Sequence, residues 1–172
     1  KWIILMLPYL IGLDGGGHYG ELMMSRLIYN FLYDPDVVNS FFGSDRIFNL
    51  KSDIKGKDID WEKIQEEVIQ WIIQGPHSPQ YVVHTQDFLD GKKIEIAKIR
   101  ISDESRGRGK SGGYRLVAFI ERRFKVIVVM HLFSKNEKPD LTPNEKNKLS
   151  KWFKKYIKSQ KSEINNQKNV IE

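Results

Sequence analysis

The spacing of hydrophobic residues predicts two amphipathic helices. The first begins after Asp60, whose side chain can cap a helix, and ends at Gly75-Pro76. The second begins at Thr142, which is spaced from Glu145 as in a capping box, and runs to about Ser159. Apolar residues recur at helical spacing in both segments, at Trp61, Ile64, Val68, Trp71 and Ile72 in the first and at Leu149, Trp152, Phe153, Tyr156 and Ile157 in the second.

Between these helices, β-branched and aromatic residues predict a group of strands. The segments "YVVHT" (81–85) and "IEIAKIRI" (94–101) are separated by the turn-forming "DFLDGKK". Residues 113–121 and 124–133 flank a turn at Arg122-Arg123, a pattern typical of a hairpin. Apolar residues of the segment 94–101 occupy both alternating sets of positions. Either both faces of this strand are covered or a bulge shifts its phase.

The N-terminal third gives weaker patterns. Residues 2–13 form an apolar run that fits a buried strand or a helix and is too short to span a bilayer. A signal-peptide core is the alternative, but the following "DGGGHYGE" is a poor cleavage site. A helix is expected from Glu21 to Leu32, ending near Asp34-Pro35. Residues 36–58 carry turn signals and predict no clear element.

Composition narrows the chemistry. The chain has no cysteine, which excludes disulfides, thiolate catalysis and cysteine-ligated zinc. Its four histidines lack paired ligand spacing, so we expect no metal. These histidines are His18, His77, His84 and His131.

The charge is divided unevenly along the chain. Residues 1–90 contain 7 basic and 13 acidic side chains, whereas residues 91–158 contain 19 basic and 7 acidic ones. The C-terminal half is therefore expected to attract polyanions, of which phosphate backbones are the usual kind. A basic but inert solvated face is the alternative.

Two glycine-rich segments raise the question of a nucleotide site. The segment "GGGHYG" (15–20) matches a dinucleotide fingerprint, but no strand ending in an acidic residue follows about 20 residues later. The segment Gly109-Lys110-Ser111 resembles the end of a phosphate loop. It lacks the first glycine of that loop, where the chain has Glu104, and it precedes a strand rather than a helix. We therefore disfavour both nucleotide interpretations.

The basic loop before the strand 113–121 has a second interpretation. Arg106, Arg108 and Lys110 alternate with small residues and lead into Tyr114 and Arg115. Arginines that hold phosphates and a tyrosine that stacks on a base are suited to RNA. In the alternative, Tyr114 faces the core and the arginines are only solvated.

Two motifs change this balance. "GKSGGYRLVAFI" opens one strand, and "LFSKNEKPDLTPNE" joins the last strand to the closing helix. In this order they resemble the RelE/ParE superfamily of bacterial type II toxins, and most closely its HigB-like members. The resemblance covers about residues 92–158. It implies an α+β fold in which a small twisted antiparallel sheet is packed against helices, here with a helical N-terminal extension.

On this basis we divide the chain into three parts. Residues 1–78 form a mostly helical region of unknown role, residues 79–160 form the toxin domain, and residues 161–172 form a frayed tail. The resemblance implies a cytoplasmic mRNA interferase that acts on mRNA in the ribosomal A site and arrests growth. It also implies a HigA-like helix-turn-helix antitoxin as partner, and no membrane. The attacking group is the RNA's own 2′-hydroxyl, so neither metal nor cofactor is implied.

The resemblance also assigns site residues. It implies that Arg115 braces the scissile phosphate, that Lys110 and Arg108 supply positive charge, and that Lys135 and Lys138 complete the pocket. Arg106 and Tyr114 would contact RNA. A lysine or arginine base needs a depressed pKa or works weakly, which would explain reliance on the ribosome to orient the substrate.

The chain departs from the family pattern just before "SKNEK". Many relatives carry a tyrosine where this chain has Phe133, which stacks but transfers no proton. His131 lies two residues earlier on the same strand face and is a candidate for the acid/base role. The alternative is a packed strand histidine.

Two further interpretations remain at this stage. One alternative to an mRNA interferase is a non-catalytic, ParE-like binder of DNA gyrase. Another is an inactive fusion, since residues 1–58 match no known pattern. The acidic N-terminal half either covers the basic surface within the same chain or simply completes the fold.

Overall fold

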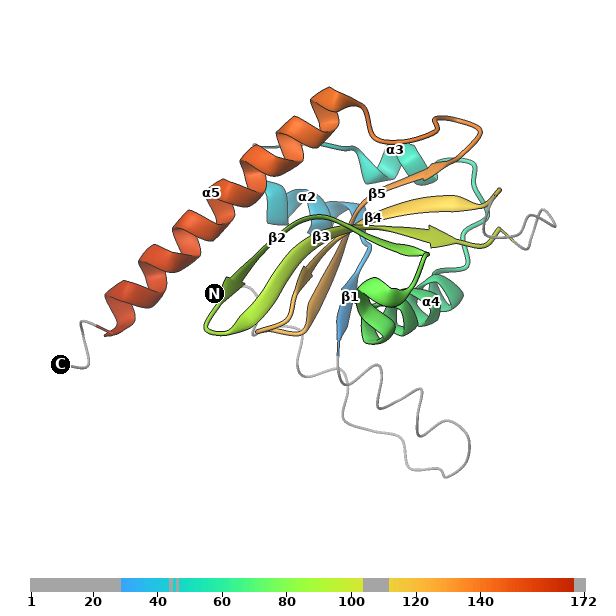
Figure 1. The fold of residues 1–172 in the computed structure, drawn as a ribbon. Coiled ribbons are helices and arrows are strands. Elements are labelled where there is room, and N and C mark those ends of the chain that lie inside the picture. Colours follow the sequence, from blue (N-terminus) through green and yellow to red (C-terminus); the bar gives the residue numbers. More distant parts are fainter. Residues whose placement is uncertain (1–28, 44, 46, 104–111, 169–172) are drawn as a thin grey trace, which may run out of the picture.

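The computed structural model describes residues 29–43, 45, 47–103 and 112–168. Its centre is a five-stranded sheet with the order β1-β5-β4-β3-β2 (Figure 1). All neighbouring strands are antiparallel except β1, which runs parallel to β5. The strands are β1 (Asn30–Leu32), β2 (Tyr81–Leu89), β3 (Lys92–Ile101), β4 (Tyr114–Glu121) and β5 (Val126–Ser134). The expected α+β class, an antiparallel sheet with packed helices, is confirmed.

Helices cover both faces of this sheet. Phe119 of β4 contacts Phe41 of α2 and Trp152 of α5, so α2 and α5 lie on one face. Tyr114 is five positions away from Phe119 on β4 and therefore faces the other way, toward the start of α4. The helices are α2 (Pro35–Phe42), α3 (Leu50–Ile54), α4 (Trp61–Gln74) and α5 (Pro143–Lys168), and a 3₁₀ turn spans Gly75–His77.

The two-sided cover explains the apolar pattern of β3. Ile94 and Ile96 pair with Glu121 and Phe119 on the α5 face, and the odd-numbered positions face α4. The register between β3 and β4 is unbroken, and the irregularity falls in β2, between Val83 and Thr85. Of the two alternatives for this strand, coverage of both faces is therefore the one that the structure has.

The caps expected for the long helices are present. The Asp60 side chain accepts a hydrogen bond from the Lys63 N–H at 3.0 Å, and α4 ends at Gly75, where φ is 67°. Thr142 and Glu145 exchange hydrogen bonds as a capping box at the start of α5. This helix continues to Lys168, beyond the expected end near residue 159.

The expected helix from Glu21 to Leu32 is wrong for its described part, because Asn30–Leu32 form β1. The Asn30 N–H donates to the Lys125 carbonyl oxygen at 2.7 Å, so pairing with β5 overrides the local helical pattern. Asp34-Pro35 does not end a helix but begins α2, where Asp34 caps the Asp36 and Val37 N–H groups. Residues 21–28 and the apolar run 2–13 lie outside the described residues.

Residues 30–74 share the hydrophobic core of the C-terminal half. Val38 of α2, Leu50 of α3 and Val68 of α4 are each at most 3% exposed and belong to one cluster with the strands. Residues 36–58, for which the sequence indicated no clear element, contain most of α2 and all of α3. One strand and three helices from this region thus complete the sheet and its cover.

Candidate functional site

A row of residues across three strands brings positive charge to one end of the sheet. Arg100 of β3 pairs with Arg115 of β4, and Arg115 pairs with Phe133 of β5. Residues directly opposite each other on adjacent strands project from the same face. This face is the one covered by α5, and we call the three residues the arginine row.

Arg115 is held rigidly within this row. It is 6% exposed, and its Nη1 donates to the Tyr114 carbonyl oxygen at 3.2 Å and weakly to that of Gly113 at 3.4 Å. Burial lowers its pKa, the neighbouring charge of Arg100 lowers it further, and Asp140 opposes both. A guanidinium remains protonated in proteins, so Arg115 provides a fixed positive charge with little water around it.

Gly113 has a structural reason to precede this strand. A Cβ atom there would lie 2.1 Å from the Ile101 carbonyl oxygen and 3.0 Å from the Asp103 nitrogen. Both are backbone atoms of the chain that leaves β3, so only glycine lets β4 start this close to β3. The second glycine of "KSGGYR" therefore allows β4 to start at Tyr114, which places Arg115 at its second position.

The loop "SKNEKPDLT" (134–142) is tied down at almost every position. The Ser134 N–H donates to Glu137 at 2.8 Å, and Glu137 bridges at 2.9 Å to Lys57, which lies between α3 and α4. Asp140 accepts from Lys98 at 2.5 Å and from Lys146 at 2.8 Å. Burial alone would raise the pKa of Asp140, but these hydrogen bonds hold it far below its usual value.

Lys138 lies over the arginine row. Its Nζ is 4.6 Å from the ring centroid of Phe133 and 2.7 Å from a Glu145 carboxylate oxygen. Burial raises the pKa of Glu145, but hydrogen bonds from Lys138 and Thr142 lower it below its usual value. Lys135 is exposed, and only its backbone N–H, 3.4 Å from the Gly113 carbonyl oxygen, is anchored.

His131 is packed beneath a helix on the same face. Its ring stacks on Phe48 with centroids 4.1 Å apart, and its Nδ1 lies 2.6 Å from the Asp53 Oδ2 atom of α3. Because the carboxylate accepts, Nδ1 is the nitrogen that donates. His131 is only 7% exposed, so this geometry is that of a packed and oriented histidine.

The structure brings together four of the expected site residues: Arg115, Lys135, Lys138 and His131 lie at one end of β4 and β5 or in the loop that follows. Tyr114 instead lies on the opposite face and is 3% exposed. Three further candidates, Arg106, Arg108 and Lys110, lie outside the described residues.

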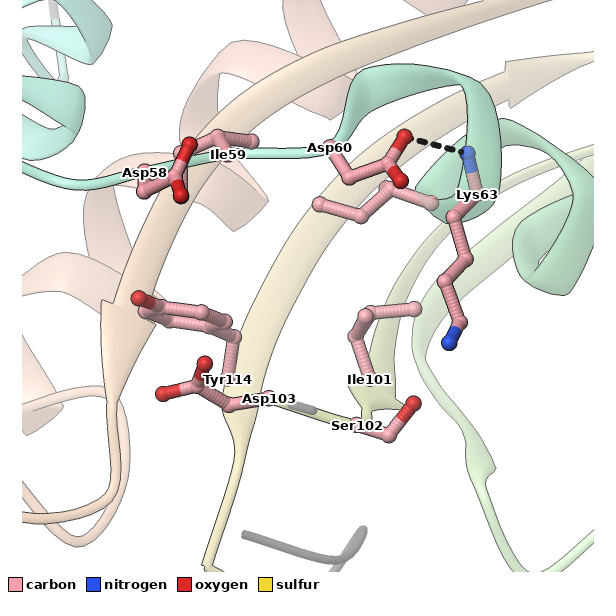
Figure 2. A pocket seen from close by; sticks show the side chains of 9 residues that line it. Asp58, Ile59, Asp60, Lys63, Ile101, Ser102, Asp103 and Tyr114 are labelled. Carbon is pink, nitrogen blue, oxygen red and sulfur yellow. Dashed lines mark hydrogen bonds between the residues drawn. The ribbon is translucent and has the colours of Figure 1, made fainter. Parts of the chain in front are cut away.

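Tyr114 lines a pocket of about 470 Å³ between α4 and the ends of β3 and β4 (Figure 2). The carboxylates of Asp58 and Asp103 lie near the tyrosine hydroxyl, and the Asp60 carboxylate points toward the Lys63 backbone as its cap. This acidic lining distinguishes the pocket from the basic face that carries Arg115.

Sequence reasoning missed three participants in this region. Lys98 and Arg100 lie on the same face as Ile94 and Ile96 by the period-2 rule, and this signal could have identified them. Asp53 gave no such signal, because 78 residues separate it from His131.

Two features are absent from the residues that the structure describes. These residues contain no group of three or more metal-ligating side chains suited to hold an ion. None of the helices within these ranges combines the length and apolar character that crossing a membrane takes.

Fold and site together define a small α+β protein that presents fixed cations at one end of a mostly antiparallel sheet. Residues 91–171, somewhat under half of the chain, match the family model described as RelE toxin of RelE / RelB toxin-antitoxin system. Over this span the chain is similar to the toxin of a toxin-antitoxin pair. Searches of curated proteins and of solved structures gave no match.

Proposed function

We propose that this protein is a HigB-like, ribosome-dependent endoribonuclease that cleaves mRNA in the cytoplasm and is neutralised by a HigA-type antitoxin. The observation that carries this proposal is the arginine row, in which Arg115 is buried and lies directly opposite Arg100 on the neighbouring strand. The matched family and the motifs "KSGGYR" and "SKNEKPDLT" support it.

The reaction needs a proton acceptor for the 2′-hydroxyl, positive charge at the phosphorus centre and a proton donor for the leaving 5′-oxygen. The 2′-oxygen then bonds to phosphorus as the bond from phosphorus to the 5′-oxygen breaks. Arg115 and Arg100 stabilise the charge that develops on the phosphate oxygens. The held position of Arg115 makes this stabilisation effective, because little reorganisation is needed in the transition state.

Lysines would serve the outer part of this pocket. Lys135 is exposed and reaches the RNA directly, with Lys110, Arg108 and Arg106 of the preceding loop as further contacts. Lys138 must leave Glu145 to engage a phosphate fully, so we assign it a secondary binding role. Tyr114 enters the proposal as support beneath the row rather than as a stacking platform, because its ring faces α4.

His131 has a fixed ring orientation but limited access to RNA. Its contact with Asp53 fixes the ring, and its burial beneath Phe48 separates it from a substrate on the surface. If His131 transfers a proton during cleavage, His131→Gln should lower kcat even when the variant is measured at a temperature where it remains folded.

The experiment that tests the proposal maps mRNA 5′ ends within minutes of inducing the wild type, Arg115→Ala and Lys110→Ala. We expect new ends within translated codons for the wild type and a loss of about 10²-fold or more in cleavage for Arg115→Ala, the scale of one lost oxyanion contact. Lys92→Ala, which removes an exposed cation at the far end of β3, is the matched control and should cleave normally. Wild-type growth arrest without new 5′ ends contradicts the proposal.

A second candidate function is a non-catalytic, ParE-like binder of DNA gyrase. The observation in its favour is Phe133, which places an apolar ring in the arginine row where many relatives have a hydroxyl. Arrest with a DNA-damage response and intact transcripts would support this candidate, and absence of arrest would support an inactive fusion.

A further inference from the structure

The outer side of α5 is a lysine-rich surface that the proposed cleavage chemistry does not use. Six lysines between residues 148 and 161 are exposed to solvent. We call them the α5 lysine stripe; they are Lys148, Lys151, Lys154, Lys155, Lys158 and Lys161.

The lysines of the stripe lie on one side of α5. Successive members are mostly three or four residues apart, which places them on one side of the helix. The apolar residues Leu149, Trp152 and Phe153 occupy the other side and are buried against the sheet. At 1.5 Å per residue, the stripe extends over roughly 20 Å.

Few carboxylates neutralise this charge. Lys155 bridges to Asp45 at 2.6 Å, and Lys161 lies 3.3 Å from an Asp87 oxygen. The other four lysines form no ion pair with a carboxylate among the residues that the structure describes. Like charges at these spacings repel each other, so a polyanion bound along the helix would relieve a repulsion that the free protein retains.

The stripe also connects to the arginine row. Lys146, in the first turn of α5, shares the Asp140 carboxylate with Lys98 of β3. Lys98 lies two residues from Arg100 on the same strand face. Positive charge therefore extends from the row, past Asp140, to the first turn of α5, where Lys146 lies two residues before Lys148 of the stripe.

The uncharged side chains on this surface indicate the kind of partner. After Pro143 at its start, those exposed along α5 are serine, asparagine and glutamine. The exposed large apolar residues lie on other elements, such as Val82 and Phe88 on β2. A protein partner would use apolar or aromatic anchors at the centre of its interface. Lysine with serine and asparagine is instead the set that contacts phosphate oxygens.

We propose that the α5 lysine stripe binds the phosphate backbone of ribosomal RNA and thereby holds the toxin on the ribosome while the arginine row acts on mRNA. This inference rests on the proposed function, because it names the second RNA surface of a ribosome-dependent enzyme. The stripe supplies affinity and orientation, and the row supplies the chemistry.

The test measures binding to purified 70S ribosomes as a function of salt for two charge-matched variants. The stripe variant is Lys151→Gln/Lys154→Gln/Lys158→Gln. The control variant, Lys51→Gln/Lys55→Gln/Lys92→Gln, removes three exposed lysines from α3, from the residue after it and from the start of β3. We expect the stripe variant to bind at least about tenfold more weakly, with a slope of log K against log salt reduced by about 2, since each phosphate contact contributes about 0.7 to 0.9.

The control variant should bind almost as the wild type does, and Lys151→Arg/Lys154→Arg/Lys158→Arg should retain binding because the charge is preserved. Equal losses in the stripe and control variants, or no loss in either, overturn the inference. Loss of neutralisation by a co-expressed antitoxin with intact ribosome binding also overturns it, in favour of an acidic protein partner. Failure of the proposed function gives a different result from failure of this inference. In that case the wild type binds ribosomes through the stripe but does not cleave mRNA.

Discussion

Replacing Gly113 by alanine should damage both the fold and the proposed activity. The added Cβ would lie 2.1 Å from the Ile101 carbonyl oxygen, whereas a carbon and a carbonyl oxygen normally approach to about 3.3 Å or more. One strand end must therefore move by about 1 Å. The obstructing atoms belong to the backbone, so no side-chain rotation relieves the contact.

The expected cost can be set from this geometry. Overpacking of a closely packed site costs about 1 to 3 kcal/mol, and an obstruction by backbone places Gly113→Ala near the upper limit. For a chain of this length each kcal/mol lowers Tm by about 2 to 4 °C, so we expect a decrease of roughly 6 to 12 °C. A shift of about 1 Å at the start of β4 also displaces Arg115 and should slow cleavage by about 10²-fold.

Gly91→Ala is the matched comparison. Its φ of 68° disfavours alanine, but no other atom lies within 4 Å of the added Cβ. The cost is then that of a left-handed backbone alone, about 1 to 2 kcal/mol, and cleavage should be unchanged. Thermal unfolding by circular dichroism and ribosome-dependent cleavage measure both effects. A Gly113→Ala protein with the wild-type Tm and cleavage rate would refute this reasoning.

Three other changes test the contacts around the site. Asp53→Ala should destabilise the protein by about 1 to 3 kcal/mol in urea unfolding, because it leaves the buried Nδ1 of His131 without its acceptor. Asp53→Asn should destabilise it less, and equal effects of the two substitutions would contradict this explanation. Thr142→Ala removes the cap of α5 and should cost about 1 kcal/mol, and an unchanged urea midpoint would show that the cap is dispensable. Asp140 has a depressed pKa in the folded state, so its stabilising effect is present above its unfolded value, near pH 4, and is lost as the pH falls through the lower folded value. Asp140→Asn should therefore flatten the loss of stability measured by unfolding below pH 4, and an unaltered pH dependence would contradict the assignment.

Local signals in the sequence determined much of the C-terminal half. The alternation of β-branched and aromatic residues located β3, β4 and β5, and the capping residues Asp60 and Thr142 located the starts of α4 and α5. These features depend on residues within one or two turns, or on neighbouring strands joined by short turns, so a linear pattern carries them. The motifs around Arg115 and in the loop 134–142 pointed to the toxin family in the same way.

Only the tertiary structure decided what the N-terminal half contributes. Asn30–Leu32 became a strand because β5 offered a partner edge, and no signal within residues 21–32 indicates that pairing. The contact of Asp53 with His131 likewise joins residues 78 positions apart. The sequence thus determined the main strands and the two long helices, together with the residue types of the site, because short-range periodicity and capping specify them. The register that aligns Arg100 with Arg115 and the packing that buries His131 arise from long-range contacts, which form only when the strands and helices are assembled.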